Sequence, residues 1–351
     1  MKSGNYKALN EKREEMSQIF NIQSNNNEKQ NWMDGKEKKP NIYFMKAKFE
    51  VDDEFYTSYH EIKEEMEDYG EYFKNKIIIC PCNDGYRSNF YRYFNTNFKK
   101  LELKKLITTT FNLNDPKAKG TKIEVTENKT TETELQGRGD FRSSEVKELI
   151  KQADIIVTNP PFSLFRDIIE IAIEKNKQFL IVGGTYSITY KKIFELYKQG
   201  KIWLGNNQVQ IFTRPNGTKK RFSNISWFTN LKSIKHLEPI KLTKKYRYNE
   251  HKYPEYDNYK IIEVTNYKNI PIDYYGVIGV PLTFFLRHNP AQFNILGCDF
   301  EIKDLYPELV KWDYKENNTR SAVLNGQEMF TRIIIQRKNG LKPRAILKNQ
   351  I

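Results

Sequence analysis

The sequence predicts an α/β protein in which a largely parallel β-sheet is covered by helices on both faces. Short apolar runs rich in β-branched residues alternate along the chain with segments whose apolar residues recur every three or four positions. Such alternation is typical of βαβ crossovers, which place helices over a parallel sheet. The chain has 351 residues, 38% of them hydrophobic, which is enough for two domains with a real core.

The elements follow in order from the N-terminus. Residues 1–47 are polar and rich in Asn and Lys, so we expect a weakly ordered basic extension. Residues 57–73 carry apolar side chains at helical spacing, which predicts one helix with a buried stripe. The run KIIIC at residues 76–80 predicts a buried strand that ends in a turn-like NDG. A helix is expected in SNFYRYFNTNF and a second strand in LKKLITTTF, residues 103–111.

Residues 112–135 are polar apart from a β-like KIEV, and we expect them to form a peripheral excursion between core elements. The segment SSEVKELIKQA then predicts a helix that Ser143 or Ser144 caps, followed by the apolar strand DIIVTN. The helix FSLFRDIIEIAIEKN and the strand QFLIVGG continue the alternation. Further strands are expected at KIWLG and NISWFTN, the second as an antiparallel addition at one side of the sheet.

Beyond Leu231 the composition changes to a stretch dense in Lys, Tyr and turn residues, and we place a domain boundary there. The chain has a net charge of +14, and residues 201–260 hold 13 basic against 4 acidic residues, a net charge of +9. Cations interleaved with tyrosines suit a nucleic-acid surface, where cations contact phosphates and rings stack on bases. The alternatives are a merely solvated basic face and a basic composition that reflects AT-rich coding.

Composition also excludes several classes of protein. Cys80, Cys82 and Cys298 cannot form a closed set of disulfides, which fits a reducing cytoplasm, and we expect buried thiols. No His or Cys residues stand at metal-ligand spacing, so no metal site is expected. The first residues lack the apolar segment of a secretory signal, and no apolar run approaches the roughly 18 residues of a membrane span. We expect a cytoplasmic protein that does not associate with membranes.

The most informative segment is DIIVTNPPF at residues 154–162, where an apolar strand ends in Asn159, Pro160, Pro161 and Phe162. Ligand sites of open α/β sheets lie at such carboxyl ends of strands. The side-chain oxygen of Asn159 and the carbonyl of Pro160 can both accept hydrogen bonds from one planar NH₂ group, and Phe162 offers a ring for stacking. We therefore expect the turn to receive an amino-bearing base; an ordinary surface turn is the alternative.

This tetrapeptide resembles the Asp/Asn-Pro-Pro-aromatic hallmark of amino-group DNA methyltransferases. Together with DEFYT, CNDGYRSNF, GDFRSSE, SNISWFTN and GVPLTFF, it makes the chain similar in order and spacing to the EcoRI-type adenine-specific methyltransferase family over about residues 48–297. The resemblance implies a Rossmann-like, S-adenosylmethionine-dependent methyltransferase sheet at residues 48–231, the catalytic domain. A smaller target-recognition region would follow at residues 232–351.

The resemblance also implies an activity: transfer of the methyl group of S-adenosyl-L-methionine to the exocyclic N6 amine of an adenine flipped out of double-stranded DNA. It implies a monomer that serves as the modification enzyme of a restriction–modification system, with the cognate restriction endonuclease as a separate protein. Asn159, Pro160, Pro161 and Phe162 would be catalytic. Independently of the resemblance, the charge of the basic window 201–260 makes Lys244, Lys245 and Arg247 candidates for holding the DNA phosphates.

The residues that the resemblance assigns to the cofactor are Asp84, Asp140, Phe141, Phe55, Tyr56 and Thr57. Each assignment has a structural alternative: an Asx-turn or helix cap for Asp84, an N-cap and a core aromatic for Asp140 and Phe141, and helix-start packing for the others. Tyr186 and Tyr190 are candidates either for the target-base pocket or for core packing.

The loop PCNDGYRSNF departs from the family. It has one glycine, Gly85, where most methyltransferases are glycine-rich, and Asn83 stands where the EcoRI type usually has Asp, so the role of Asn83 stays open. The second strand lacks the acidic residue that normally holds the cofactor ribose. Two other functions therefore remain: a methyltransferase for RNA bases or protein glutamine, whose glycine-rich loop is absent here, and a non-catalytic DNA-binding protein.

Overall fold

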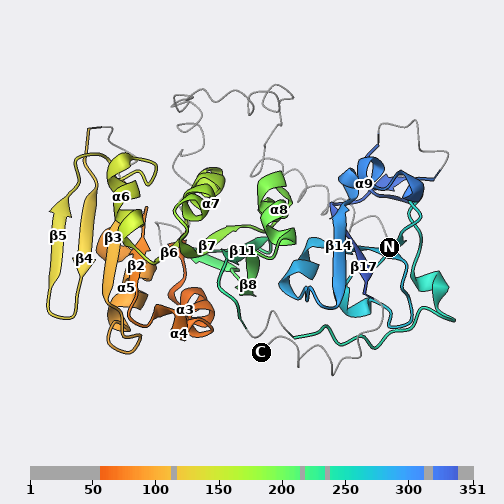
Figure 1. The fold of residues 1–351 in the computed structure, drawn as a ribbon, viewed down its shortest axis with the longest axis horizontal. Helices are drawn as coiled ribbons and strands as arrows, with labels where there is room; N and C mark the ends of the chain where they lie inside the picture. The colour runs from red at the N-terminus through yellow and green to blue at the C-terminus, as the bar shows by residue number, and fades with distance from the viewer. Residues whose placement is uncertain (1–55, 112–116, 214–217, 234–237, 312–318, 339–351) are drawn as a thin grey trace. The chain divides into compact units, whose positions relative to one another are not determined.

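The computed structural model describes residues 56–111, 117–213, 218–233, 238–311 and 319–338 (Figure 1). The extension expected at residues 1–47 and the predicted cofactor residue Phe55 lie outside these ranges.

Within the described residues the main sheet has eight strands in the order β5-β4-β3-β2-β6-β7-β11-β8 (Figure 1). β2, β3, β6 and β7 are parallel, whereas β4, β5 and β11 run antiparallel to their neighbours. The strands are β2 Ile77–Cys80, β3 Lys105–Thr109, β4 Thr121–Val125, β5 Thr130–Glu134, β6 Ile155–Thr158, β7 Gln178–Gly184, β8 Trp203–Gln208 and β11 Ile225–Thr229. The predicted α/β fold is confirmed, and the predicted antiparallel strand β11 lies between β7 and β8 rather than at an edge.

Helices cover both faces of this sheet because its strands are apolar on both sides. In β2, Ile78 and Cys80 belong to one core cluster and Ile79 to the other, as the period of two in a strand requires. One face is covered by α3 Tyr59–Glu67, α4 Gly70–Phe73 and α5 Asn89–Thr96. The other is covered by α6 Ser144–Gln152, α7 Phe165–Glu174 and α8 Lys191–Lys198.

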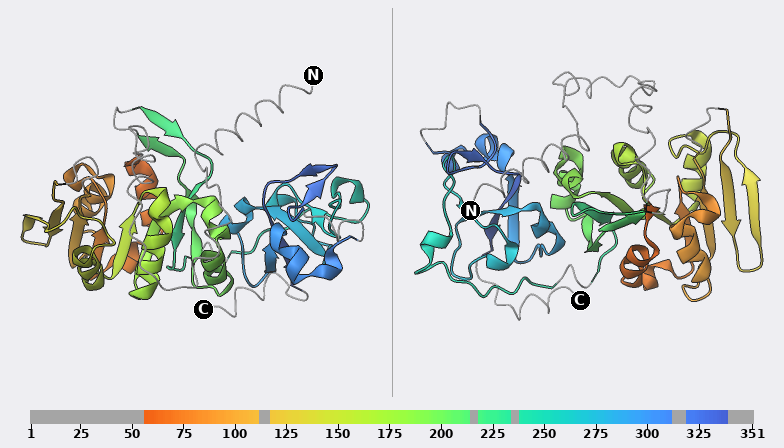
Figure 2. Two further views of the ribbon diagram at one scale, coloured as in Figure 1. Left: turned by 90° about the horizontal axis from the view of Figure 1, so that it is seen from above. Right: turned by 180° about the vertical axis from the view of Figure 1, so that it is seen from behind.

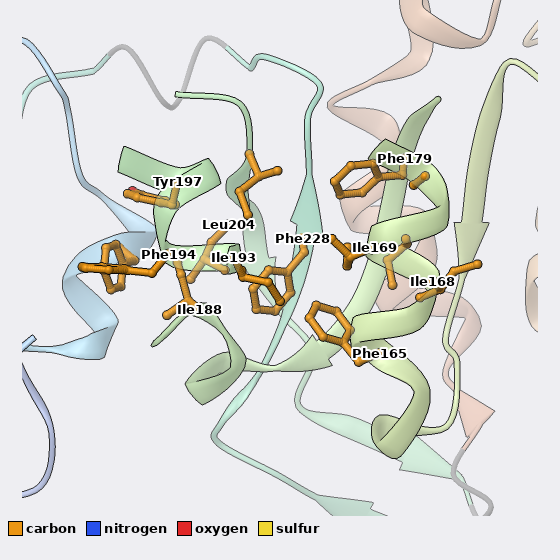
Figure 3. Packing of buried hydrophobic residues seen from close by; sticks show 14 of the residues in the cluster. Phe165, Ile168, Ile169, Phe179, Ile188, Ile193, Phe194, Tyr197, Leu204 and Phe228 are labelled. Carbon is orange, nitrogen blue, oxygen red and sulfur yellow. The ribbon is translucent and has the colours of Figure 1, made fainter. Parts of the chain in front are cut away.

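The core under α7 and α8 is rich in aromatic rings (Figure 3). Phe165, the first residue of α7, meets Phe228 of β11 edge-on with 4.7 Å between ring centroids. A Cβ atom on Gly183 of β7 would lie 2.4 Å from the Phe165 ring, so the glycine allows α7 to start directly against the sheet. The start of α7 is thereby fixed relative to β7 and β11.

The single helix predicted at residues 57–73 is wrong in its extent. Thr57 belongs to β1 Tyr56–Thr57, which pairs antiparallel with β9 Ile211–Thr213; β10 Lys219–Arg221 completes this three-stranded sheet. In Figure 2, left, β9 and β10 are the two green strands that project from the main sheet. α3 begins only after Ser58, whose hydroxyl accepts from the backbone N of Glu61, and a break precedes α4 at Gly70.

Two glutamates on α3 hold the end of β8 and the start of β9. The carboxylate of Glu65 accepts from the backbone N of Asn206 at 2.9 Å and of Asn207 at 2.8 Å. Glu61 accepts from the backbone N of Gln210 and Ile211 at 3.1 and 2.9 Å. Burial raises the pKa of Glu65 to about 7, although these hydrogen bonds act in the opposite direction.

The excursion expected at residues 112–135 is more regular than predicted. β4 and β5 form an antiparallel hairpin that pairs with β3 and extends the main sheet at its edge. The outer strand β5 is largely exposed and carries Glu132 and Glu134, charges that oppose pairing with another chain. The excursion is therefore peripheral, as expected, but it belongs to the sheet.

A second, smaller sheet follows the main one, in the order β12-β13-β17-β14. Its elements are β12 Ile262–Glu263, β13 Val277–Pro281, β14 Phe293–Cys298, α9 Asp299–Leu305 and β17 Arg332–Arg337, with the pair β15 Val323–Leu324 and β16 Gln327–Glu328 beside them. The hydroxyl of Tyr197 on α8 lies 3.0 Å from Nδ1 of His288, and Phe285 packs edge-on against Tyr197. Both sheets thus share one continuous hydrophobic core.

The thiols are less uniform than expected. Cys80 and Cys298 are buried, as predicted, but Cys82 is half-buried and follows the carboxyl end of β2. Among the described residues, no helix has the length and apolar composition needed to cross a membrane.

Candidate active site

The site lies where the order of strands reverses around β2. From β2 the chain passes to β3 on one side, and later to β6 and β7 on the other side. The carboxyl ends of β2 and β6 therefore border the crevice in which open α/β sheets bind ligands. The hydroxyl of Thr158, the last residue of β6, donates to the carbonyl of Pro81 at 2.6 Å and joins the two strand ends.

The NPPF turn begins directly after this bridge. Asn159 and Phe162 are half-buried, and Phe162 packs partly against the core under α3 and α5. The carbonyl of Pro161 accepts from the backbone N of Leu164 at 2.8 Å, which starts the short 3₁₀ turn Phe162–Leu164. Within the described part of the chain no hydrogen bond reaches the carbonyl of Pro160. The turn thus offers an uncommitted backbone acceptor beside a half-buried amide and a half-buried ring.

The loop after β2 is held by Asn83, whose role was left open by the sequence. Its backbone N donates to the carbonyl of Thr109 at 2.9 Å, and its side-chain nitrogen donates to Pro81 at 3.1 Å. Its side-chain oxygen accepts from the hydroxyl of Ser88 at 3.1 Å, and Ser88 caps α5. Gly85 has φ +53°, a conformation that L side chains rarely adopt. In this structure Asn83 and Gly85 shape the loop in place of a glycine-rich sequence.

Asp84 is presented by this loop. Its side chain is exposed and makes no capping hydrogen bond to the 3₁₀ turn Gly85–Arg87, so the cap alternative for this residue is not realised. Its backbone carbonyl accepts from Arg87 at 3.1 Å, which fixes the backbone that carries the carboxylate. A negative acceptor therefore stands at the carboxyl end of the central strand.

Asp140 lies beside the same strand ends, but its carboxylate already has a partner. It accepts from Nε of Arg142 at 3.0 Å and from Nη2 at 2.7 Å, and also from the backbone N of Arg142 at 2.8 Å. It does not cap α6, because the N-cap is Ser143. Phe141 is fully buried in the core, which favours the packing alternative for this ring. Contact of either residue with a cofactor stays a prediction.

Tyr56 and Thr57 form strand β1, which contacts the start of α5, directly after the loop that follows β2. The side-chain amide of Asn89, the first residue of α5, donates to the carbonyl of Thr57 at 3.0 Å. Tyr56 is half-buried, and the hydroxyl of Thr57 is buried without a hydrogen-bond partner. Thr57 therefore contacts one end of the segment 82–89, and Asp140 and Phe141 lie next to Cys82 at its other end.

The remaining predicted residues fall into two groups, the tyrosines that follow β7 and the cations that precede the small sheet. Tyr186 follows β7 and is 46% exposed, and its ring meets that of Tyr190 edge-on, so Tyr186 is not simply a core residue. The cations Lys244, Lys245 and Arg247 are exposed on the segment before the small sheet and come from none of the strand ends around β2. Lys245 is close enough to Asp273 to help lower the pKa of that carboxyl, and the Arg247 guanidinium lies over the Tyr248 ring at 5.1 Å, but no salt bridge to a described carboxylate is formed by these three cations.

Sequence reasoning missed two residues that hold the site together at the carboxyl ends of the strands. Thr158 bridges to a carbonyl 77 positions earlier, and nothing local in the sequence indicates such a contact. Arg142 could have been noticed, because an Arg two positions after an Asp can fold back on it. Among the described residues, no group of three or more His, Cys, Asp or Glu side chains could hold a metal ion.

Comparison with known proteins gives one family. Residues 43–338 match the family model described as adenine-specific methyltransferase EcoRI. Three curated relatives are similar along almost their whole length. The Type II methyltransferase M.MgeORF184P of Mycoplasma genitalium is 38% identical over 319 residues, 84% of this chain and 99% of the relative.

The Type II methyltransferase M.MpnI of Mycoplasma pneumoniae is 37% identical over 321 residues, 85% of this chain and 99% of its own. The Type II methyltransferase M.EcoRI of Escherichia coli is 38% identical over 333 residues, 85% of this chain and 97% of its own. No solved structure gives a significant match.

Proposed function

The chain belongs to the EcoRI family of adenine-specific methyltransferases, and from this membership we propose that it is a DNA methyltransferase that modifies the exocyclic N6 amine of adenine. The observation that carries the proposal is the NPPF turn at the strand end, with the free carbonyl of Pro160 beside Asn159 and Phe162. Such an array can accept both hydrogens of one amino group.

The polar groups in and around the loop after β2 can form hydrogen bonds with S-adenosyl-L-methionine. The exposed carboxylate of Asp84 can accept from its ammonium or ribose hydroxyl groups, and the buried, unpartnered hydroxyl of Thr57 marks an unfilled polar position on the opposite side. Asp140 retains acceptor capacity for an adenine amine, since a carboxylate offers about four lone-pair sites. When bound, this cofactor supplies an electrophilic methyl group.

The residues of the turn then act on the amine. Its lone pair is delocalised into the adenine ring, which makes it a weak nucleophile. Asn159 and Pro160 accept its two hydrogens, favour a pyramidal nitrogen and stabilise the positive charge that develops there. Because the amine is paired inside duplex DNA, the base must leave the stack, and Phe162 offers a ring to replace the lost stacking. Alignment in one pocket accounts for much of the remaining rate.

We assign the catalytic domain to residues 48–231 and DNA target recognition to residues 232–351, where the exposed cations Lys244, Lys245 and Arg247 suit phosphates. The enzyme would act as a monomer in the cytoplasm, as the modification partner of a separate restriction endonuclease. The related RNA and protein methyltransferases and a non-catalytic DNA-binding protein are disfavoured by the family membership.

Methylation-aware sequencing of DNA from cells that express the protein tests this proposal. We expect N6-methyladenine at one short recurring sequence, and transfer of label from S-adenosylmethionine to duplex DNA by the purified protein. Label that entered only RNA or protein, or no transfer by folded protein, would contradict the proposal.

A further prediction concerns the carboxylates of the cofactor site. Asp84→Ala and Asp140→Ala should each weaken S-adenosylmethionine binding about 10- to 100-fold, the scale of one hydrogen bond to a charged group. Binding of duplex DNA without cofactor should stay near the wild-type level. Glu127→Ala removes an exposed carboxylate from the β4–β5 turn and serves as control. Wild-type affinity of both variants in calorimetry would show that the cofactor residues are assigned wrongly.

A further inference from the structure

Arg142 stands between two parts of the active site. Its guanidinium meets the carboxylate of Asp140 through Nε and Nη2, and its Nη1 lies 3.4 Å from the carboxylate of Asp167 in the first turn of α7. Asp167 is separated by only four residues from Phe162 of the NPPF turn. One side chain thus contacts both the Asp140 loop and the helix that follows the turn.

We propose that Arg142 is a positioning residue, which fixes the orientation of the Asp140 carboxylate for the cofactor and ties it to α7. The proposal rests on the proposed function, because it assumes that Asp140 faces S-adenosylmethionine. Arg142 itself touches neither cofactor nor base.

The hydrogen-bond geometry leaves Asp140 usable. Oδ1 accepts from the backbone N and from Nε of Arg142 at 2.8 and 3.0 Å, while Oδ2 accepts from Nη2 at 2.7 Å and shares the Nε–H group at 3.2 Å. An ionised carboxylate has about four lone-pair sites, and Arg142 occupies it with three N–H groups, so the carboxylate can still accept from one further amine. A planar guanidinium fork also fixes the plane of the carboxylate, which a single ammonium cannot do.

The surrounding loop does not need Arg142 to hold its backbone. Gly139 has φ +85° and approaches the carbonyl of Thr110 so closely that a Cβ would lie 1.9 Å from it. Phe141 is fully buried, and Ser143 caps α6. Because three other anchors fix the chain, we assign the ion pair to the orientation of the carboxylate rather than to the fold of the loop.

The ion pair is also protected enough to orient a group. Arg142 and Asp140 are each 25% exposed, so solvent screens their interaction only in part. The hydrogen bonds to Asp140 raise the pKa of Arg142 above its usual value, which keeps the guanidinium charged. The contact with Asp167, which is 43% exposed, is longer and more screened, and we expect it to contribute less.

The test compares four variants by calorimetry with S-adenosylmethionine and S-adenosylhomocysteine. Arg142→Gln should weaken binding of both about tenfold, the lower end for a hydrogen bond to a charged group. Arg142→Lys should recover only part of this loss, and Asp167→Asn should change affinity less than about threefold. Steady-state assays should show a higher KM for the cofactor with kcat nearly unchanged. The control Arg320→Gln removes the exposed pair with Asp304 and should leave the affinity unchanged.

A double-mutant cycle separates this proposal from its premise. If Arg142 acts through Asp140, Arg142→Gln should add little to the loss that Asp140→Asn already causes. A weakened Asp140→Asn with wild-type affinity in Arg142→Gln would overturn the positioning role and leave the proposed function intact. Wild-type affinity in both would overturn the assignment of Asp140 itself. A lower thermal midpoint without loss of affinity would make Arg142 a merely structural residue.

Discussion

Asn159→Ala is expected to slow methyl transfer about 100-fold or more, while folding and S-adenosylmethionine binding survive. The change removes one acceptor for the target amine, and deleting one preorganised polar contact to a transition state commonly costs 10²- to 10³-fold in kcat. The prolines, the Thr158 bridge to Pro81 and the loop after β2 stay in place. Single-turnover assays with labelled cofactor measure the rate of transfer to adenine directly.

Two further variants test whether the effect of Asn159→Ala is specific. Asn159→Asp should keep partial activity, because a carboxylate is still an acceptor at the same position. Asn95→Ala, an exposed amide on α5, is the matched control and should transfer at the wild-type rate. If Asn159→Ala also transferred at that rate, the NPPF turn would not be the catalytic site.

The second large effect is expected in DNA binding. Changing Lys244, Lys245 and Arg247 together to Ala should weaken duplex binding and flatten its dependence on salt. Each phosphate contact contributes about −0.9 to the slope of log K against log salt, so three lost contacts should reduce the slope by about 2.7. Titrations between roughly 50 and 200 mM salt would measure both quantities.

A second triple variant controls for net charge. Lys151, Lys175 and Lys192 each pair with a glutamate of the same protein, and their joint replacement by Ala removes the same formal charge. Because these cations already have partners, that variant should keep the wild-type slope. An unchanged slope in the first variant would instead mean that its three cations are only a solvated face.

Much of the main sheet could be predicted because its signals are local. β2 and β6 are short β-branched runs between polar residues, and the period of α6 and its Ser143 cap are readable within ten residues. The hairpin β4–β5 was seen only as KIEV, since its outer strand is polar and depends on β3 for pairing. The sequence alone places Thr57 in a helix, because the strand β9 that pairs with it lies about 155 residues later in the chain.

In the candidate site, too, the features with a local sequence signal were predictable and those that depend on tertiary contacts were not. The NPPF turn follows an apolar strand, so its position at the carboxyl end of a sheet strand was predictable. The burial of Phe141 and the pairing of Asp140 with Arg142 were not, because both depend on how close the loop lies to Thr110 and α7. The role of Asn83 as the residue that shapes the loop also needed the structure.

The two glutamates of α3 affect when this helix can fold against the rest of the chain during synthesis. Their backbone partners lie 141 to 150 positions downstream, from Asn206 to Ile211. Until that stretch is synthesised, docking α3 would bury two carboxylates without donors, which costs about 1–3 kcal/mol or more for each group. This cost opposes early docking of α3. We therefore expect α3 to dock only after β8 and the start of β9 have been synthesised.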